Sequence, residues 1–231
     1  MHTSATAWWA PKSGNAASEY EDAYAVKPEA LRFAVADGAS ETSFARQWAE
    51  LLVEGFVQDA PSPAGLHDFV APLQAVWAEG QKGKATAWYS ERKAADGAFS
   101  SLLGVTIEGD RWRAVAVGDS CLFVLRAFPL ERAEQFNNRP SLLSSVARAN
   151  AGVWSQVATV DGDLQEKDRL LLMTDALAQW FLVEAERGRR PWAALAKVTT
   201  PEQFTAYIDC LRAGGALRND DVTLVSVEVA A

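Results

Sequence analysis

The chain has 231 residues, of which 49% are hydrophobic, 10% aromatic and 23% charged, a composition that excludes a mainly disordered protein. Its length predicts one large domain, residues 1–231, that can fold without a disulfide or a metal ion. Thirty acidic residues against 22 basic ones give a net charge of −8, which argues against nucleic acid or a membrane surface as a partner. With two cysteines and no segment typical of a signal peptide or a membrane span, we expect a cytoplasmic protein.

The first part of the chain alternates short apolar runs with helical patterns. The runs that predict strands are 6–9, 22–26 and 31–36. From Ser40 to Ala60, apolar residues recur at three- and four-residue intervals and predict an amphipathic helix, with Ser40 or Ser43 as its cap. A second helical region begins at Leu66 and ends near residue 94 or 95, and Pro72 could interrupt it.

The second part begins with a predicted meander of strands over 99–108, 111–118 and 121–126, in which Gly109-Asp110 forms a turn. Residues 128–153 have weak periodicity and are expected to form an irregular excursion over the surface, a candidate flap. The elements expected after it are strands at 157–160, 169–174 and 222–229 and helices at 176–187 and 201–213. Together these patterns predict an α+β fold in which helices cover antiparallel sheets.

Acidic residues recur at the ends of these predicted strands: Glu21, Asp22, Asp37, Asp119, Asp175 and Asp220. Any one of them alone is typical of a turn. If the strand ends converge in a sandwich, six carboxylates would repel one another and lose hydration, which disfavours their charged forms. Divalent cations would relieve this repulsion, and oxygen ligands without a His or Cys cluster favour Mg²⁺ or Mn²⁺ over zinc.

Other chemistries find less support in the sequence. His2 and His67 have no partner at metal-ligand spacing and are expected to be structural or solvated. The chain contains neither a Gly-x-Ser-x-Gly elbow nor a Gly-x-x-x-x-Gly-Lys-Ser/Thr phosphate loop. These absences argue against a serine hydrolase and against a kinase or nucleotide hydrolase.

Five short motifs, each weak alone, occur in an order and spacing that is fairly specific. They are Gly14 with Glu21-Asp22-Ala23-Tyr24, then Val35-Ala36-Asp37-Gly38, Val117-Gly118-Asp119-Ser120, Leu171-Leu172-Met173-Thr174-Asp175, and Asp220-Asp221-Val222-Thr223. In these motifs the chain resembles the metal-dependent protein phosphatases, the type 2C serine/threonine (PPM-type) family, as a divergent compact member. The resemblance covers nearly the whole chain. It implies a four-layer αββα sandwich, two antiparallel β-sheets covered by helix pairs, with a binuclear metal site at one end.

The resemblance also implies roles for the acidic residues around two Mg²⁺ or Mn²⁺ ions and a third, weaker one. One ion would take Glu21 and the carbonyl of Gly38, another Asp175 and Asp220, with Asp37 bridging them and Asp119 supporting the third together with Asp175. Asp22 and Asp221 would lie behind these ligands, and Asp37, Asp175 and Asp220 would be catalytic. A water that bridges the two metal ions would then hydrolyse phosphoserine or phosphothreonine monoesters of a phosphoprotein substrate.

The chain departs from the family pattern at positions that handle the phosphate. The family's phosphate-binding Arg falls on Ala17, its Asn before Glu-Asp on Tyr20, its His-Gly-Gly on Ala39-Ser40-Glu41, a usual Gly on Ala176 and a usual Asn on Asp221. Substitute cations could come from Lys12, Arg46, Arg132, Arg139 or Arg148. The alternative to an enzyme is therefore a catalytically weak or inactive relative that serves as a binding or regulatory module.

Overall fold

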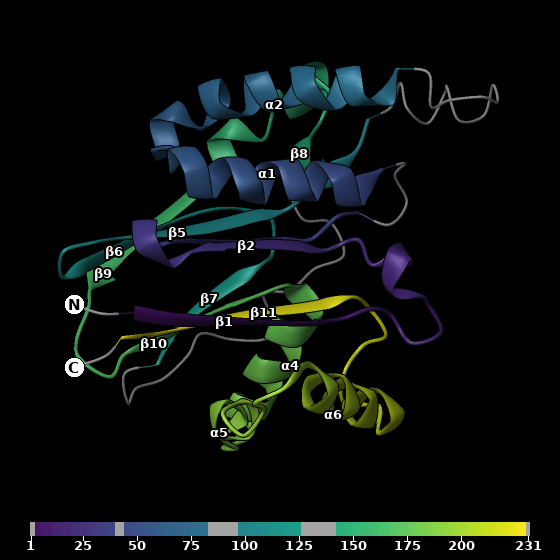
Figure 1. Ribbon diagram of the computed structural model, residues 1–231, viewed down its shortest axis with the longest axis vertical. Coiled ribbons are helices and arrows are strands. Elements are labelled where there is room, and N and C mark those ends of the chain that lie inside the picture. Colours follow the sequence, from purple (N-terminus) through teal and green to yellow (C-terminus); the bar gives the residue numbers. More distant parts are fainter. Residues whose placement is uncertain (1–2, 40–43, 83–96, 126–141, 230–231) are drawn as a thin grey trace.

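The computed structural model describes residues 3–39, 44–82, 97–125 and 142–229. These residues form two stacked antiparallel sheets with helices on both outer faces (Figure 1). This is the αββα arrangement of the α+β class that the sequence predicts. No helix of the described ranges is both long enough and apolar enough to cross a membrane.

The strands fall into two main sheets and one short pair. The first sheet has the order β1 (Thr3–Ala10), β11 (Val222–Val229), β10 (Arg169–Met173) and β7 (Cys121–Leu125). The second sheet has the order β2 (Ala23–Lys27), β3 (Arg32–Ala36), β5 (Leu102–Glu108), β6 (Arg111–Val117) and β9 (Ala158–Asp163). The short pair is β4 (Phe99–Ser100) with β8 (Leu143–Ser144).

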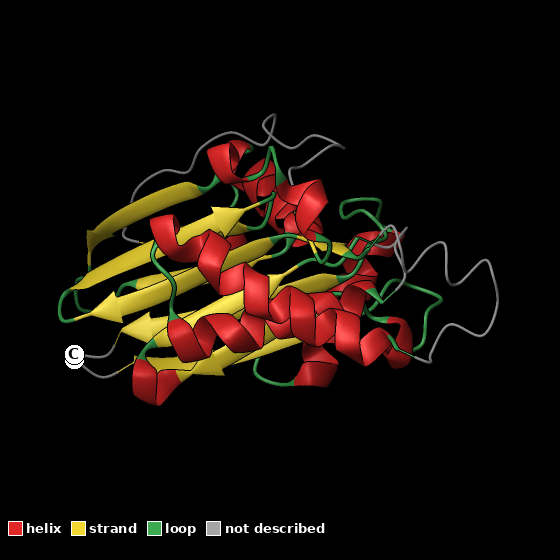
Figure 2. Ribbon diagram, turned by 90° about the horizontal axis from the view of Figure 1, so that it is seen from above, coloured by secondary structure: helices red, strands yellow, loops and turns green. Residues whose placement is uncertain are grey.

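The helices cover the two outer faces of this sandwich. α1 (Ala45–Asp59) lies on the second sheet, and α2 (Leu66–Gln81) packs on the outer side of α1 (Figure 1). Seen from above in Figure 2, these helices lie in front of the strands. On the first sheet lie α4 (Asp175–Glu186), α5 (Pro191–Leu195) and α6 (Pro201–Ala213). Each outer pair of layers buries the apolar stripe of its helices, as expected for amphipathic helices on a sheet.

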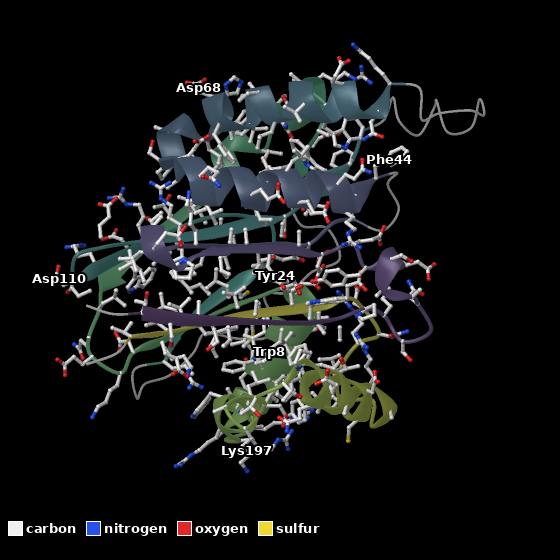
Figure 3. All side chains as sticks on the ribbon, viewed as in Figure 1. Trp8, Tyr24, Phe44, Asp68, Asp110 and Lys197 are labelled. Atoms are coloured by element: carbon white, nitrogen blue, oxygen red, sulfur yellow. The ribbon has the colours of Figure 1, made fainter. Side chains whose placement is uncertain are left out.

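Three apolar cores separate the four layers, and side chains fill the spaces between them (Figure 3). Trp48 and Phe56 of α1 are buried against the second sheet, Phe181 of α4 lies in the core against the first sheet, and Phe33 is buried between the sheets. Burying each such side chain stabilises the fold by roughly 1.5–3 kcal/mol. The packing between the sheets fixes how their strand ends meet.

The predicted helices are largely confirmed, with changes at their ends. The predicted caps Ser40 and Ser43 lie outside the described residues, and α1 begins after Phe44, whose backbone is left-handed at φ 63°. Pro72 lies inside α2 without interrupting it, because it is exposed and its missing N–H leaves a carbonyl that solvent can reach. α2 ends at Gln81, and the predicted end of the helical region near residue 94 or 95 lies outside the described residues.

The predicted meander is wrong in its connections. The first run is divided into β4 and β5, and β5 pairs with β6 as predicted, but β7 leaves the hairpin and pairs with β10 of the other sheet. Gly118 makes this crossing possible, because its φ of +104° is a backbone conformation that residues with side chains rarely adopt. Long-range pairing of this kind leaves no local sequence signal.

In the described part of the expected surface excursion over 128–153, residues 143–145 are buried, whereas residues 147–149 and 151–152 are exposed. Residues 126–141 lie outside the described ranges. Leu143 is fully buried, and its carbonyl accepts a hydrogen bond of 2.9 Å from the indole nitrogen of Trp48. Asn150 is also fully buried and bonds both backbone groups of Ser144 through its amide. Leu143 and Val153 therefore belong to the apolar core that also holds α1. α5 is a further element that the sequence pattern did not predict.

Candidate metal centre

The register of the strands brings the acidic motifs to one end of the sandwich, opposite the end at which β1 begins and β11 ends (Figure 1). In the second sheet Ala36 pairs with Ala23, so that the residue after β3 and the residue before β2 are neighbours. In the first sheet Met173 pairs with both Leu224 and Cys121. The five chain segments that carry Asp22, Asp37, Asp119, Asp175 and the pair Asp220-Asp221 therefore end or begin at the same edge.

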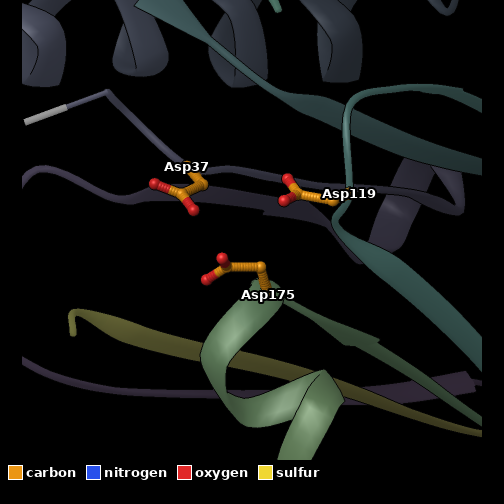
Figure 4. A group of neighbouring side chains, drawn as sticks. All are labelled: Asp37, Asp119 and Asp175. Carbon is orange, nitrogen blue, oxygen red and sulfur yellow. The ribbon is translucent and has the colours of Figure 1, made fainter. Parts of the chain in front are cut away.

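Three carboxylates, called here the inner group, meet at this end: Asp37, Asp119 and Asp175. One oxygen of each lies within 4.8 Å of the others, and Figure 4 shows the three side chains pointing toward one another. Asp37 follows β3, Asp119 lies in the turn from β6 to β7, and Asp175 is the first residue of α4. Asp175 is only 8% exposed, and its Oδ1 has no hydrogen-bond partner.

Two members of the inner group, Asp37 and Asp119, have raised pKa values. Burial raises the pKa of Asp37 well above its usual range, and the charges of Asp22, Asp175 and Asp119 raise it further. Burial, followed by the charge of Asp175, raises the pKa of Asp119 to about 6. Carboxylates that are this close and this poorly hydrated favour a bound cation over three free charges.

Asp22 lies behind the inner group and ties the two sheets together. Its Oδ2 accepts hydrogen bonds from the hydroxyls of Thr174 at 2.9 Å and Thr223 at 2.8 Å. Its Oδ1 is buried without a partner, and burial is the main cause that raises its pKa to about 8. The hydroxyls are held in turn, since Thr174 also accepts the backbone N–H of Thr223 at 2.9 Å. Asp22 is therefore placed to support its neighbours.

Gly38 lies where the loop before β2 crosses the loop after β3. A Cβ built at Gly38 would stand 2.6 Å from the carbonyl oxygen of Glu21 and 3.1 Å from the backbone of Ala45. No side chain fits there, because the obstructing atoms belong to the backbone. The glycine thus allows Glu21 to approach Asp37 closely.

The remaining acidic ligands expected from the sequence, Glu21 and Asp220, lie beside the inner group and are paired with cations. The ammonium of Lys12 lies 3.6 Å from Glu21 Oε2 and 3.2 Å from Asp220 Oδ1. Arg218 Nη2 lies 2.9 Å from Asp220 Oδ2 and also contacts Asp175 Oδ2. We call Glu21, Asp220, Lys12 and Arg218 the rim group.

Asp221 is not aimed at the inner group. Its Oδ1 accepts the backbone N–H of Lys12 at 2.7 Å, and its Oδ2 accepts the backbone N–H of Glu21 at 2.8 Å. Asp221 therefore lies behind the proposed ligands, where its carboxylate holds the backbone of the loop that carries Lys12 and Glu21. Tyr20, which stands where the family has Asn, is also not aimed at the inner group. It is 4% exposed, packs against Trp9 and hydrogen-bonds to Thr223.

The cations suggested by the sequence have different surroundings. Lys12 belongs to the rim group, whereas Arg46 pairs with Glu50 at 2.8 Å and donates to the carbonyl of Ala17 at 3.3 Å. Arg132 and Arg139 lie outside the described residues, and Arg148 lies in a short helical turn at Ala147–Asn150. Arg218 is the cation that sequence reasoning missed. Its only signal is its place two residues before Asp220.

Solved structures similar to this chain include serine/threonine phosphatases. The chain is similar to the Mycobacterium tuberculosis phosphatase PstP/Ppp, with 18% identity, a TM-score of 0.67 and 100% of each chain covered. The PstP catalytic domain in complex with two manganese ions gives 17% identity and a TM-score of 0.61 over 99% of each chain. The photosystem II phosphatase PBCP gives 15% identity and a TM-score of 0.64 over 99% of each chain.

No family model and no curated protein matches the sequence. The likeness therefore lies in the fold, which is that of the type 2C, metal-dependent serine/threonine phosphatases. The family resemblance of the sequence motifs agrees with this fold over the whole length of the chain.

Proposed function

We propose that the chain, as one phosphatase domain, hydrolyses phosphoserine and phosphothreonine monoesters of proteins with Mg²⁺ or Mn²⁺. The observation that carries this proposal is the inner group, which gathers three carboxylates at the end of a type 2C fold. Asp175 Oδ1 is a buried carboxylate oxygen without a hydrogen-bond partner. Because buried polar atoms are normally paired, this oxygen supports the proposal that a metal ion binds here. A donor set made only of oxygen fits a hard divalent ion.

The ligands in this proposal are Glu21, Asp37, the carbonyl of Gly38, Asp119, Asp175 and Asp220. Divalent ions held there supply Lewis-acid polarisation of the phosphoryl group and a water of lowered pKa. The chain itself fixes the ligands: Asp22 anchors both Thr174 and Thr223 behind them, and Asp221 holds the loop of Lys12 and Glu21. We propose two ions, the number of manganese ions in the PstP complex, and a third, weaker ion with Asp119 and Asp175.

The direct test is hydrolysis of an aryl phosphate and of phosphoserine and phosphothreonine peptides by the purified chain. We expect turnover with Mn²⁺ or Mg²⁺ and none after chelation. Turnover that persists in chelator would contradict the metal-dependent mechanism. Turnover of the aryl phosphate without turnover of any phosphopeptide would contradict the protein-phosphatase activity alone.

A second candidate is a catalytically weak or inactive module that binds a partner through this face. The rim group favours it, because Lys12 and Arg218 already balance the charges of Glu21 and Asp220. The absence of an arginine at Ala17 favours it as well. Metal binding without hydrolysis in the same assays would support this second candidate over the enzyme.

A further inference from the structure

Arg218 occupies a fixed position at the open side of the metal centre. It lies between α6 and β11, next to Leu217, which is 5% exposed. On its other side Asn219 accepts the backbone N–H of Ser13 at 2.7 Å and donates to the carbonyl of Ser13 at 3.3 Å. The neighbours therefore hold the backbone, while the Arg218 side chain remains 43% exposed.

The guanidinium of Arg218 connects the two groups of carboxylates. It contacts Oδ2 of Asp175, an inner residue, and lies 2.9 Å from Oδ2 of Asp220, a rim residue. An arginine side chain stays charged at all physiological pH values and offers five N–H donors in a planar fork. If Asp175 and Asp220 turn toward a divalent ion, these donors lose their acceptors at the mouth of the site.

A phosphate monoester is the anion that matches those released donors. Guanidinium groups bind two phosphate oxygens through parallel, charge-assisted hydrogen bonds. We propose that Arg218 binds the phosphate of the substrate, and that in the metal-free protein it serves as the counter-ion of Asp175 and Asp220. This inference rests on the proposed phosphatase function, since it assigns a substrate-binding residue to the same site.

The other cations near the site are less suited to this role. Lys12 has a side chain that is 20% exposed and presents a single ammonium between Glu21 and Asp220. The side chain of Arg46 is 44% exposed, more than that of Lys12, but its acceptors are Glu50 and the backbone carbonyl of Ala17. Neither of those acceptors belongs to the proposed metal ligands, so metal binding would not release Arg46.

The experiment measures the affinity of the Mn²⁺-saturated protein for inorganic phosphate by calorimetry, alongside KM and kcat for an aryl phosphate. In Arg218→Gln we expect phosphate affinity to fall about 10- to 100-fold, the range for hydrogen bonds to a charged group. KM should rise more than kcat falls. Arg218→Lys should keep part of the affinity, because it retains the charge but loses the planar fork.

Mn²⁺ affinity provides a readout that does not depend on turnover. It should be equal or tighter in Arg218→Gln, because the substitution removes a cation that competes for Asp175 and Asp220. Arg187→Gln is the matched control: it removes one exposed arginine, paired at 3.7 Å with Glu184, far along α4 from the site. This control should change neither phosphate nor Mn²⁺ affinity.

The possible failures are distinguishable. Wild-type phosphate affinity in folded, Mn²⁺-loaded Arg218→Gln would overturn the inference while the phosphatase function stands. If phosphate affinity falls in Arg46→Gln instead, the phosphate is bound by Arg46. If the loaded wild-type protein neither binds phosphate nor hydrolyses the ester, both proposals fail. Phosphate binding through Arg218 without hydrolysis would keep Arg218 as a phosphate-binding residue, but it would overturn its role toward a substrate together with the enzyme.

Discussion

The inner group and the rim group are built from the same kind of residue but balance their charge differently. In the inner group, Asp37 and Asp119 respond to crowding with raised pKa values. In the rim group, Glu21 and Asp220 are paired with Lys12 and Arg218. Arg218 also contacts Asp175, so the difference indicates that Asp37 and Asp119 depend on a bound ion for their charge balance, whereas the rim can remain ordered with cations of the chain itself.

The largest expected effect comes from removing a charge of the inner group. Asp37→Asn should lower metal-dependent kcat/KM by about 1000-fold or more, equivalent to at least ~4 kcal/mol of transition-state stabilisation, because a neutral amide is a poor ligand for two cations. Aryl phosphate turnover and Mn²⁺ calorimetry measure this. Asp68→Asn, on the exposed side of α2, is the control that should retain activity. Wild-type turnover in Asp37→Asn would remove Asp37 from the mechanism.

The inner group and Asp22 should also make the metal-free protein less stable as pH rises. The folded pKa values of Asp22, about 8, and Asp119, about 6, exceed the unfolded value near 3.8. The folded state therefore binds more protons than the unfolded state from about pH 4 to 8, and the free energy of unfolding falls across this window.

Thermal unfolding in chelator between pH 5 and pH 8 measures this slope. Asp22→Asn should flatten it, because the amide stays neutral across the window. A Tm of the metal-free wild-type protein that rises from pH 5 to pH 8 would contradict the prediction. A slope that is the same in Asp22→Asn would locate its cause elsewhere.

Bound Mn²⁺ should reverse the instability of the inner group. An ion that binds only the folded state adds about 2.7 kcal/mol at 100 times Kd, and for a chain of this size the Tm should rise by about 5–10 °C. The shift should vanish in Asp37→Asn and persist in Asp68→Asn. Melting curves that do not change from micromolar to millimolar Mn²⁺ would count against the site.

The smallest effect on the protein is expected from Asp221, which holds the loop that carries the rim residues Lys12 and Glu21. Asp221 accepts two backbone N–H groups, those of Lys12 and Glu21. Asp221→Asn leaves one oxygen for two donors, so the free energy of unfolding should fall by about 1–2 kcal/mol. Urea unfolding measures this, with the exposed Asp209→Asn as control. Unchanged stability would show that the loop is held by other contacts.

Much of the fold could be predicted because its elements have local periodicity. Trp48, Leu52 and Phe56 recur at helical spacing and are all buried on one face of α1. The turn at Gly109-Asp110 sets the β5–β6 hairpin, in which Glu108 pairs with Arg111. The segment from Leu143 to Val153 could not be predicted in this way, because its burial depends on α1, which is distant in the sequence.

The sequence by itself determined which residues carry negative charge and that each follows or precedes a strand. Only the tertiary structure decided which of them meet: strand register and sheet packing bring Asp37, Asp119 and Asp175 together from three separate segments. It also decided that Arg218, rather than a cation near Ala17, reaches Asp175 and Asp220. The physical reason is that local periodicity sets backbone conformation, whereas Coulomb interactions act over a few ångströms in space, between residues that may be far apart in the chain.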